Sequence, residues 1–507
     1  MRQQTKQQIM SVYTQYTSIL IILAGIFTVS LASSAERSEL FYSRTGLFEA
    51  WMENLTRTLD LPGISVGLVH EQELLYAKSF GHADINQKFL ATNQTIYSVA
   101  SLSKLFTALG LMQLVEGKQI ELDDAAVQYI PELYQLQSSK EDIESITIRS
   151  ILRHTTGLPI NNNYLLTSAS PVINNLTQIL EGLSQQKLIH PPNSRFHYSN
   201  LAMSLGGIII SRVAQKDYSQ YIADTIFTPL HMNASSFDIL PRNEAAIGYS
   251  RSTANGRTTT SGWDMGKAIG IPAAGLKTNI QDLARFVSWH FETLNGTPSR
   301  ILDQGTLEYM QHIHWAQLSF VLPKLIQSGV THLSDAFDIG GSGLGYSRTG
   351  KFVRHSGGID GFGAELLMDN ENKIGIIVLA NSSDAPVNWD ASPSISRNLF
   401  EIVGTALLME LGPMSGDYAD YQKVYTDHHY FNYYAMPSGE GLSLMDLNSD
   451  FPMRSPIMLS PLQEDDAYFA PDHKAFYAEE FFVRFRRNDQ KKITSLVLAS
   501  NILNAMD

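Results

Sequence analysis

The chain has 507 residues, of which 44% are hydrophobic, so it can bury at least one large core, and its length is typical of roughly two to four domains. The formal net charge is −13 and no long Lys/Arg block occurs, which argues against a nucleic-acid partner. Cysteine is absent, so disulfides, thiol catalysis and a lipid anchor on cysteine are excluded.

Residues 1–35 have the pattern of a secretory signal peptide. Arg2 and Lys6 precede an apolar run over residues 19–32, and three small residues follow it. The run is shorter than the roughly 20 residues that span a bilayer. We therefore expect a mature chain that begins at Glu36, is periplasmic or secreted, and has no stable membrane anchor; an uncleaved N-terminal anchor is the alternative.

Two pairs of strand-like runs lie far apart in the chain. Residues 63–69 and 74–80 flank a polar turn, and residues 363–368 and 374–379 flank a second one. Hairpins at both ends of a region favour one antiparallel sheet that is assembled from its two termini.

Between the hairpins, apolar periodicity predicts helices over Ser101–Glu116 and Ala202–Val213 and a third that begins near Thr278. Thr278 and Gln281 have the spacing of a capping box. The strands and helices together predict an α+β domain of about residues 41–410.

Residues 420–507 are rich in Tyr and Phe and contain strand-like runs at 481–485 and 493–498 around a polar turn. This composition predicts a small all-β domain. The segment Gly412–Asp417 is a plausible boundary before it.

Ser101 and Lys104 form a Ser-x-x-Lys motif at the start of the predicted apolar helix. At that position the backbone N–H groups are free, and the helix dipole favours developing negative charge on Ser101. Desolvation of Lys104 and the nearby helix end disfavour its ammonium form, so the amine could accept a proton. The alternative is a capping serine and a snorkelling surface lysine. A second match, Ser184 to Lys187, lies in a polar run and is interpreted as a loop.

Tyr198 and Asn200 are two residues apart in a segment that leads into an apolar helix. From an extended segment both side chains point the same way. A neighbouring cation would lower the pKa of Tyr198 and let it relay a proton between nucleophile and leaving group, while Asn200 could hold an amide of the acyl donor. Alternatively Tyr198 is a core aromatic and Asn200 a helix cap; Tyr430-Phe431-Asn432 is a second match.

The segment 352–363 is rich in glycine beside a predicted strand, which suggests close backbone approach to a ligand. An edge strand here could offer the Gly358 N–H alongside the Ser101 N–H as an oxyanion hole, a type of interaction worth about 3 kcal/mol per donor. The alternative is a glycine-rich strand corner in which His355 is a satisfied histidine.

In this order the three motifs resemble the serine β-lactamase and penicillin-recognising superfamily, most closely its class C-like branch of esterases, D-stereospecific peptidases and β-lactamase-related proteins. The resemblance covers about residues 45–405, including flanking segments 150–159 and 273–286. It implies a β-lactamase/transpeptidase-like fold, which is an antiparallel sheet flanked by helices with a helical subdomain. The C-terminal stretch resembles the lipocalin-like domain that often follows this fold.

The resemblance implies that Ser101 is the acylated nucleophile, that Lys104 activates it, and that Tyr198 is the base for acylation and for activation of the deacylating water. The oxyanion hole would be formed by Ser101 and Gly358. No cofactor or metal is implied.

The resemblance also implies that Asn200, His355, Ser356 and Gly357 bind substrate. His355 stands where many members have lysine, and a histidine is only partly charged near neutral pH. This departure puts recognition of penicillin and D-Ala-D-Ala in doubt and is similar to the pattern of esterase and peptidase members.

Other histidines are interpreted as structural or surface residues. His312 and His314, like His428 and His429, lack a partner at metal-ligand spacing. His154 lies in a turn that resembles the family and is interpreted as structural rather than catalytic.

The sequence thus predicts an exported, metal-independent serine hydrolase acting through an acyl-enzyme on an ester, amide or lactam, with a small molecule or peptide, cell-wall fragments included, as substrate. One alternative is a non-catalytic, penicillin-recognising cell-wall binding or regulatory protein. Another is that the C-terminal β domain is itself a lipid or peptide binding module. The substrate and the oligomeric state stay open at this level.

Overall fold

The computed structural model describes residues 41–161, 177–238, 245–260, 270–316, 341–349, 351–408, 421–426, 432–438, 441–454, 456–461, 467–469, 482–488, 490–498 and 501–506. The predicted signal segment 1–35 and the predicted boundary Gly412–Asp417 lie outside these residues. In the ranges described, no helix has the length and hydropathy needed to cross a membrane.

The chain folds into two compact units. One is Leu55–Arg397, and the other combines the described residues up to Asn54 with those from Asn398 onward. The predicted ranges, 41–410 and 420–507, differ from these units because residues 41–54 and 398–408 group with the C-terminal strands.

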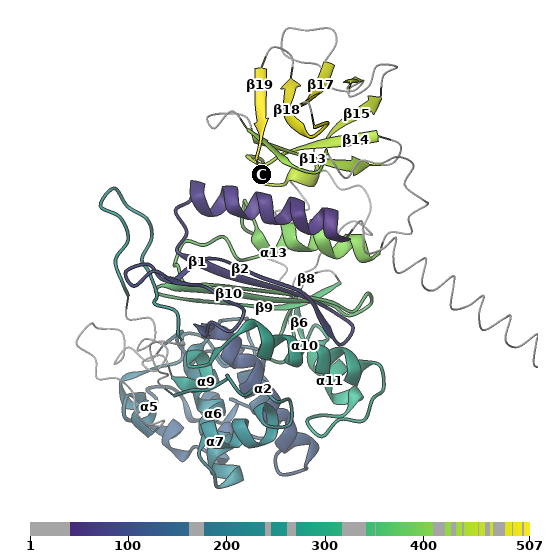
Figure 1. Ribbon diagram of the computed structural model, residues 1–507. Helices are drawn as coiled ribbons and strands as arrows, with labels where there is room; N and C mark the ends of the chain where they lie inside the picture. Colours follow the sequence, from purple (N-terminus) through teal and green to yellow (C-terminus); the bar gives the residue numbers. More distant parts are fainter. Residues whose placement is uncertain are drawn as a thin grey trace, which may run out of the picture. The chain divides into compact units, whose positions relative to one another are not determined.

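The larger unit is built on an antiparallel sheet, in which nine strands are seen among the described residues (Figure 1). Their order is β3-β2-β1-β11-β10-β9-β8-β7-β6. The strands are β1 Gly63–His70, β2 Glu73–Asp84, β3 Phe89–Leu90, β6 Trp315–Ala316, β7 Gly341–Ser342, β8 Ser347–Thr349, β9 Phe352–Ile359, β10 Phe362–Asp369 and β11 Ile374–Ala380.

Both predicted hairpins are confirmed, and they meet in the centre of this sheet. Strand β1 pairs with β2 on one side and with β11 on the other, with Val66 opposite both Lys78 and Val378. Every residue of β11 is buried, so this strand is the apolar middle of the sheet. The expectation of one antiparallel sheet assembled from its two ends is therefore correct.

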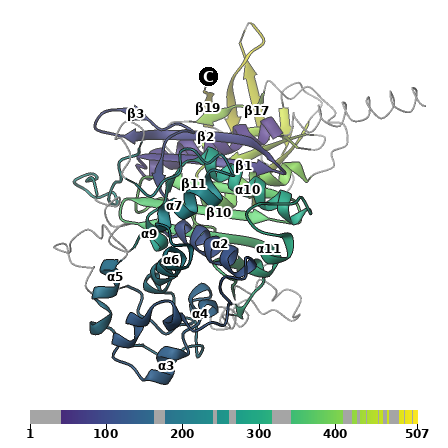
Figure 2. The ribbon, with the colours of Figure 1, turned by 90° about the horizontal axis from the view of Figure 1, so that it is seen from below.

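Helices of the larger unit lie on one face of the sheet (Figure 1). They are α2 Ser103–Glu116, α3 Lys140–Glu144, α4 Ile148–Leu152, α5 Thr177–Glu181, α6 Asn200–Ala214, α7 Tyr218–Ile222, α9 Ile271–Ala274, α10 Ile280–Leu294 and α11 Gln304–Gln311. A further short helix, α13 Ile395–Asn398, spans the boundary between the two units. Figure 2 shows α3, α4 and α5 grouped to one side of α2 and α6, as expected for a helical subdomain.

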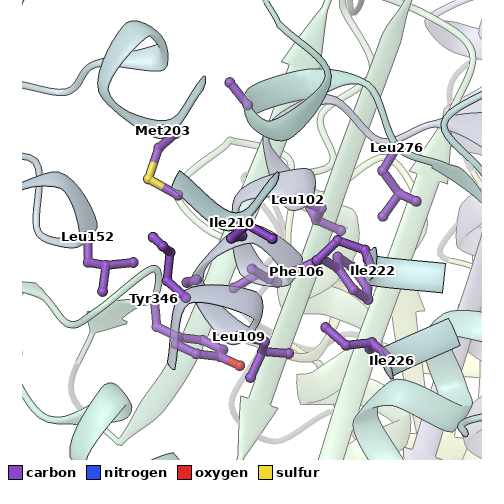
Figure 3. Packing of buried hydrophobic residues seen from close by; sticks show 14 of the residues in the cluster. Leu102, Phe106, Leu109, Leu152, Met203, Ile210, Ile222, Ile226, Leu276 and Tyr346 are labelled. Atoms are coloured by element: carbon purple, nitrogen blue, oxygen red, sulfur yellow. The ribbon is translucent and has the colours of Figure 1, made fainter. Parts of the chain in front are cut away.

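The helix α2 is the centre of the apolar core, and most of its residues are buried whichever way they point. Phe106 stacks against Phe286 of α10 with ring centroids 4.6 Å apart, and Figure 3 shows it among side chains from several elements. A β-carbon on Gly207 of α6 would lie 2.1 Å from Pro272, so α6 and α9 pack at a distance that only glycine permits. This packing fixes α2, α6 and α9 relative to one another.

Hydrogen-bonded caps define where the helices begin. Ser199 accepts a hydrogen bond from Ala202 N and caps α6. For α10 the predicted capping box at Thr278 is wrong, because Asn279 is the cap and accepts from Asp282 N. Thr278 lies instead in the short strand β5 Lys277–Thr278, which pairs with β4 Tyr97–Ser98.

In the C-terminal unit, eight consecutive strands are seen to form a closed antiparallel barrel within the described ranges, where β19 returns to pair with β12. The strands are β12 Val424–Thr426, β13 Asn432–Ser438, β14 Gly441–Asp446, β15 Ile457–Pro461, β16 Ala467–Phe469, β17 Phe482–Arg487, β18 Ile493–Leu498 and β19 Asn501–Ala505. The expected small all-β domain and its β17–β18 hairpin are confirmed.

An N-terminal helix is described from residue 41 to residue 58, and its part up to Asn54 belongs to the same unit as this barrel. Trp51 Nε1 donates to Ser449 O at 3.1 Å, and Asn54 Nδ2 donates to Leu447 O at 2.8 Å. These long-range hydrogen bonds explain why the unit contains both ends of the described chain.

Candidate active site

Ser101 lies in a short 3-10 turn, Ala100–Leu102, directly before α2. The α-helix therefore begins at Ser103 rather than at Ser101 as the sequence predicted. Ala100 has a φ of 46°, a left-handed conformation that costs energy for a residue with a β-carbon. Among the described residues no backbone acceptor is seen for the Ser101 N–H. The turn thus presents the serine with its own N–H available to a ligand.

Lys104 is completely buried and contacts Ser101. Its Nζ lies 3.0 Å from Ser101 Oγ and donates to Ala273 O at 2.7 Å. Burial lowers the pKa of Lys104 well below its usual range, because an ammonium ion is poorly solvated there. The snorkelling surface lysine is thereby excluded, and the environment favours the neutral amine, which is the form that can accept a proton.

Tyr198 completes the group, since its hydroxyl donates to Ser101 Oγ at 2.9 Å. Lys104 Nζ lies 4.9 Å from the centre of the Tyr198 ring. The expected lowering of the tyrosine pKa is wrong: burial raises the pKa of Tyr198 to about 12, and the hydrogen bond to Ser101 opposes this only in part. Near neutral pH the phenol is a proton donor and Lys104 is the stronger candidate base.

The strand β9 brings the glycine-rich segment to Ser101. A β-carbon on Gly357 would lie 2.1 Å from Val99 O, so the strand passes directly against the residue before the nucleophile turn. Ile359 pairs with Phe362 across a two-residue turn, and alternation along the ladder then directs the Gly358 N–H away from β10. On that side β8 covers only Phe352 to Arg354. The Gly358 N–H is thus at an open edge, as an oxyanion donor requires.

His355 also lies on β9 and is only 8% exposed. Its Nδ1 is 2.7 Å from Ser356 O. Burial, helped by the nearby Lys104, lowers the pKa of His355 to about 4. The expectation of a partly charged histidine near neutral pH is therefore wrong: the ring is neutral. Ser356 itself is half-buried on the neighbouring register position.

Asn200 is the first residue of α6, and its side-chain Nδ2 donates to Asn161 Oδ1 at 2.8 Å. Its Oδ1 is buried without a hydrogen-bond partner in the part of the chain that the structure describes. A buried amide oxygen without a donor is suited to receive an N–H from a bound molecule. Sequence reasoning missed Asn161, because it is the first of three consecutive asparagines and nothing in the pattern distinguishes it.

The remaining sequence candidates lie elsewhere. Ser184 is an exposed residue of the 3-10 turn Leu183–Gln185, and Lys187 is exposed as well. His312 and His314 each bind a backbone carbonyl through a ring nitrogen. No cluster of three potential metal ligands occurs among the described residues.

The second Tyr-x-Asn match and the second histidine pair lie near the start of the C-terminal strands in the sequence. Tyr430 lies outside the described residues, as do His428 and His429. Asn432 accepts a hydrogen bond from Thr426 in the barrel and is structural.

The sequence model of the Beta-lactamase family matches residues 48–393. Among curated proteins, Protein flp of Staphylococcus aureus (strain COL) is 27% identical over 378 residues, which cover 72% of this chain and 68% of flp.

Two solved structures share the fold. The octameric penicillin-binding protein homologue from Pyrococcus abyssi is 22% identical, with a TM-score of 0.56, and the match covers 90% of this chain and 99% of that one. The D-amino acid amidase from Ochrobactrum anthropi SV3, complexed with L-phenylalanine amide, is 21% identical, with a TM-score of 0.57 over 72% of this chain and 98% of the amidase.

Proposed function

The chain belongs to the beta-lactamase family of serine hydrolases, and we propose that it cleaves uncharged esters or amides through an acyl-enzyme on Ser101. One observation carries this proposal: Ser101 Oγ lies 3.0 Å from the fully buried amine of Lys104 and 2.9 Å from the hydroxyl of Tyr198. A nucleophile, a desolvated base and a proton donor are thereby in hydrogen-bond contact.

In acylation, Ser101 Oγ attacks the carbonyl carbon while Lys104 accepts the hydroxyl proton. The new C–O bond forms as the carbonyl π electrons move to oxygen, and the oxyanion is held by the N–H groups of Ser101 and Gly358. The bond to the leaving group then breaks, and Tyr198 donates a proton to that group. The phenolate is reprotonated by the ammonium of Lys104, so the serine proton ends on the released alcohol or amine.

Deacylation reverses these steps with water as the nucleophile. Lys104 accepts a proton from the attacking water, the same two N–H groups hold the oxyanion, and Ser101 Oγ leaves with a proton that Tyr198 supplies. Tyr198 is a proton donor in this mechanism rather than the primary base, because its raised pKa disfavours the phenolate in the resting enzyme.

The preference for uncharged substrates rests on the protonation of the groups around Ser101. Burial lowers the pKa values of Lys104, His355 and His154, so it favours the neutral form of each of these three groups. None of them offers the fixed positive charge that a substrate carboxylate would need. We therefore expect esters and amides without a carboxylate beside the scissile bond to be favoured over lactams and D-peptides that carry one.

Hydrolysis of p-nitrophenyl butyrate, followed by product release and by intact-protein mass, tests the proposal. We expect a butyryl adduct on wild-type protein, continuous turnover, and loss of both in Ser101→Ala. An adduct that forms once and persists without turnover would instead favour the non-catalytic binding protein. Turnover that survives Ser101→Ala would refute the proposed nucleophile.

We also propose that the C-terminal unit is a lipocalin-like barrel. Its closed, sequentially ordered antiparallel strands support this, since that is the up-and-down arrangement of lipocalins. The barrel contains an apolar cluster of side chains, among them Tyr425, Leu442, Leu444, Phe485 and Leu496. A packed cluster is what a structural barrel needs, and it does not favour the barrel as a separate lipid-binding module.

The proposal of an exported enzyme rests on residues 1–35. N-terminal sequencing of the protein recovered outside the cytoplasm tests it, with Glu36 as the expected first residue. Recovery of an intact N-terminus in the membrane fraction would favour the uncleaved anchor.

A further inference from the structure

His154 packs directly on the proton donor of the site. Its ring lies 4.4 Å from the ring of Tyr198, centre to centre, with the two planes only 31° apart. Phe196 contacts the same imidazole edge-on at 5.8 Å. The phenol of Tyr198 therefore has Lys104 Nζ at 4.9 Å and a histidine ring as two of its neighbours.

The same histidine also fixes the backbone around Tyr198. Its Nδ1 accepts a hydrogen bond from the Ser199 N–H at 3.2 Å, and its carbonyl oxygen accepts from His197 N at 2.8 Å. The residues before and after Tyr198 are thus both hydrogen-bonded to His154. His154 itself has a φ of 58°, a left-handed conformation that histidine and asparagine adopt more readily than most residues.

From these contacts we propose that His154 is a positioning residue that sets the orientation of the Tyr198 hydroxyl toward Ser101 and toward the leaving group. The proposal rests on the proton-donor role given to Tyr198 above. In this proposal the face of the imidazole ring orients the phenol of Tyr198, and Nδ1 anchors the backbone at Ser199.

The anchoring of the backbone at Ser199 requires a neutral imidazole, because Nδ1 must keep a lone pair to accept the Ser199 N–H. Complete burial lowers the pKa of His154 well below its usual range, and the nearby Lys104, His355 and His197 add to the effect. The ring therefore keeps its acceptor at the pH at which the enzyme works.

Two substitutions separate the two contacts. In His154→Asn the amide oxygen occupies the position of Nδ1 and the left-handed backbone is tolerated, but the ring face is lost. In His154→Phe the ring face stays and the acceptor is lost. His290→Asn is the matched control, since His290 is equally buried but contacts Phe286 and Tyr346 instead.

The readout is the dependence of kcat/KM on the leaving group, measured with ethyl butyrate and p-nitrophenyl butyrate. Ethanol needs a proton to leave and p-nitrophenolate does not, so a misplaced Tyr198 slows only the ethyl ester strongly. For His154→Asn we expect the ethyl ester to lose about 10- to 100-fold and the p-nitrophenyl ester less than about 3-fold. His154→Phe and His290→Asn are expected to change the ratio of the two rates by less than about 3-fold.

A double-mutant cycle decides whether His154 acts through Tyr198. If it does, His154→Asn in a Tyr198→Phe background lowers the ethyl-ester rate by no more than about 2-fold. Additive losses in the double variant, or equal losses on both esters in His154→Asn, would overturn the proposal. A Ser101→Ala variant with full activity would instead overturn the proposed function, so the two failures are distinguishable.

Discussion

Two segments of this chain have the same Ser-x-x-Lys spacing and opposite surroundings. Lys104 has no exposed surface and lies 3.0 Å from Ser101 Oγ. Ser184 and Lys187 are both exposed, and the backbone oxygen of Ser184 merely accepts a hydrogen bond from Gln137 Nε2. Spacing alone therefore does not predict chemistry; in the proposed mechanism, desolvation of the amine is what lets Lys104 act as a base toward Ser101.

The largest difference is expected when the two serines are removed. Ser101→Ala should lower the turnover of p-nitrophenyl butyrate by about 10⁴-fold or more, because Ser101 carries the one hydroxyl seen hydrogen-bonded to Lys104 among the described residues. Ser184→Ala should leave turnover within about 2-fold of wild type. Similar losses in the two variants would mean that the exposed motif contributes to catalysis.

The second largest difference is expected between the kcat/KM values of variants at the two lysines, Lys104 and Lys187. Lys104→Arg introduces a permanent cation of similar reach that cannot act as a neutral amine, so kcat/KM should fall by about 10³-fold, whereas Lys187→Arg should have no effect. The wild-type kcat/KM should fall as the pH decreases through the lowered pKa of Lys104, because protonation removes the base. A Lys104→Arg variant with unchanged kcat/KM would exclude the amine as the base.

Burial favours the neutral form of the acid Glu365, as it favours the neutral form of the base Lys104. Glu365 on β10 is completely buried, on the strand face opposite to that of Ala364 and Leu366. Arg354 Nη1 lies 3.7 Å away without a hydrogen bond, so desolvation outweighs this cation and raises the pKa of Glu365 to about 8.

The protonated carboxyl then stabilises the fold below about pH 4.5, and this contribution is lost as pH rises to about 8. Glu365→Gln is always neutral at this position. The difference in unfolding free energy between this variant and wild type should therefore increase in favour of the variant by about 2–4 kcal/mol as the pH rises from about 5 to about 9. Urea denaturation measures this gain. The exposed Glu371→Gln is the control, and equal pH dependence in both variants would contradict the raised pKa.

The smallest effect is expected on substrate charge. His355→Lys places an amine where the neutral ring now lies, and we expect kcat/KM for a carboxylate-bearing ester to rise about 5- to 10-fold relative to p-nitrophenyl butyrate. If the relative rates stay as in wild type, the neutral histidine is not what disfavours charged substrates.

The sequence predicted the parts of the structure that depend on local patterns. The two hairpins follow from alternating runs, and α2 from the apolar spacing after Ser101. The α10 cap was assigned to Thr278 because two adjacent residues, Thr278 and Asn279, both suit a cap, and only the backbone conformation distinguishes them.

Among the properties that depend on burial, the sequence predicted the desolvation of Lys104, which lies in an apolar helix, but not that of its neighbours. The pKa of Tyr198 was expected to fall because its cationic neighbour could be anticipated and its desolvation could not. The same is true of the neutral state of His355. The grouping of residues 41–54 with the barrel depends on contacts nearly four hundred residues away in the chain, such as that from Trp51 to Ser449.

The central position of β1 has a consequence for how the protein is made. Although β1 is the first strand to leave the ribosome, its outer edge is filled only when β11 arrives, since His70 pairs with Ile374. Long-range pairing of this kind slows folding, and a nascent chain extends by only about 5–20 residues per second. For a period of many seconds the apolar first hairpin has an open edge, which makes the half-synthesised chain a natural client for chaperones that protect unpaired strands.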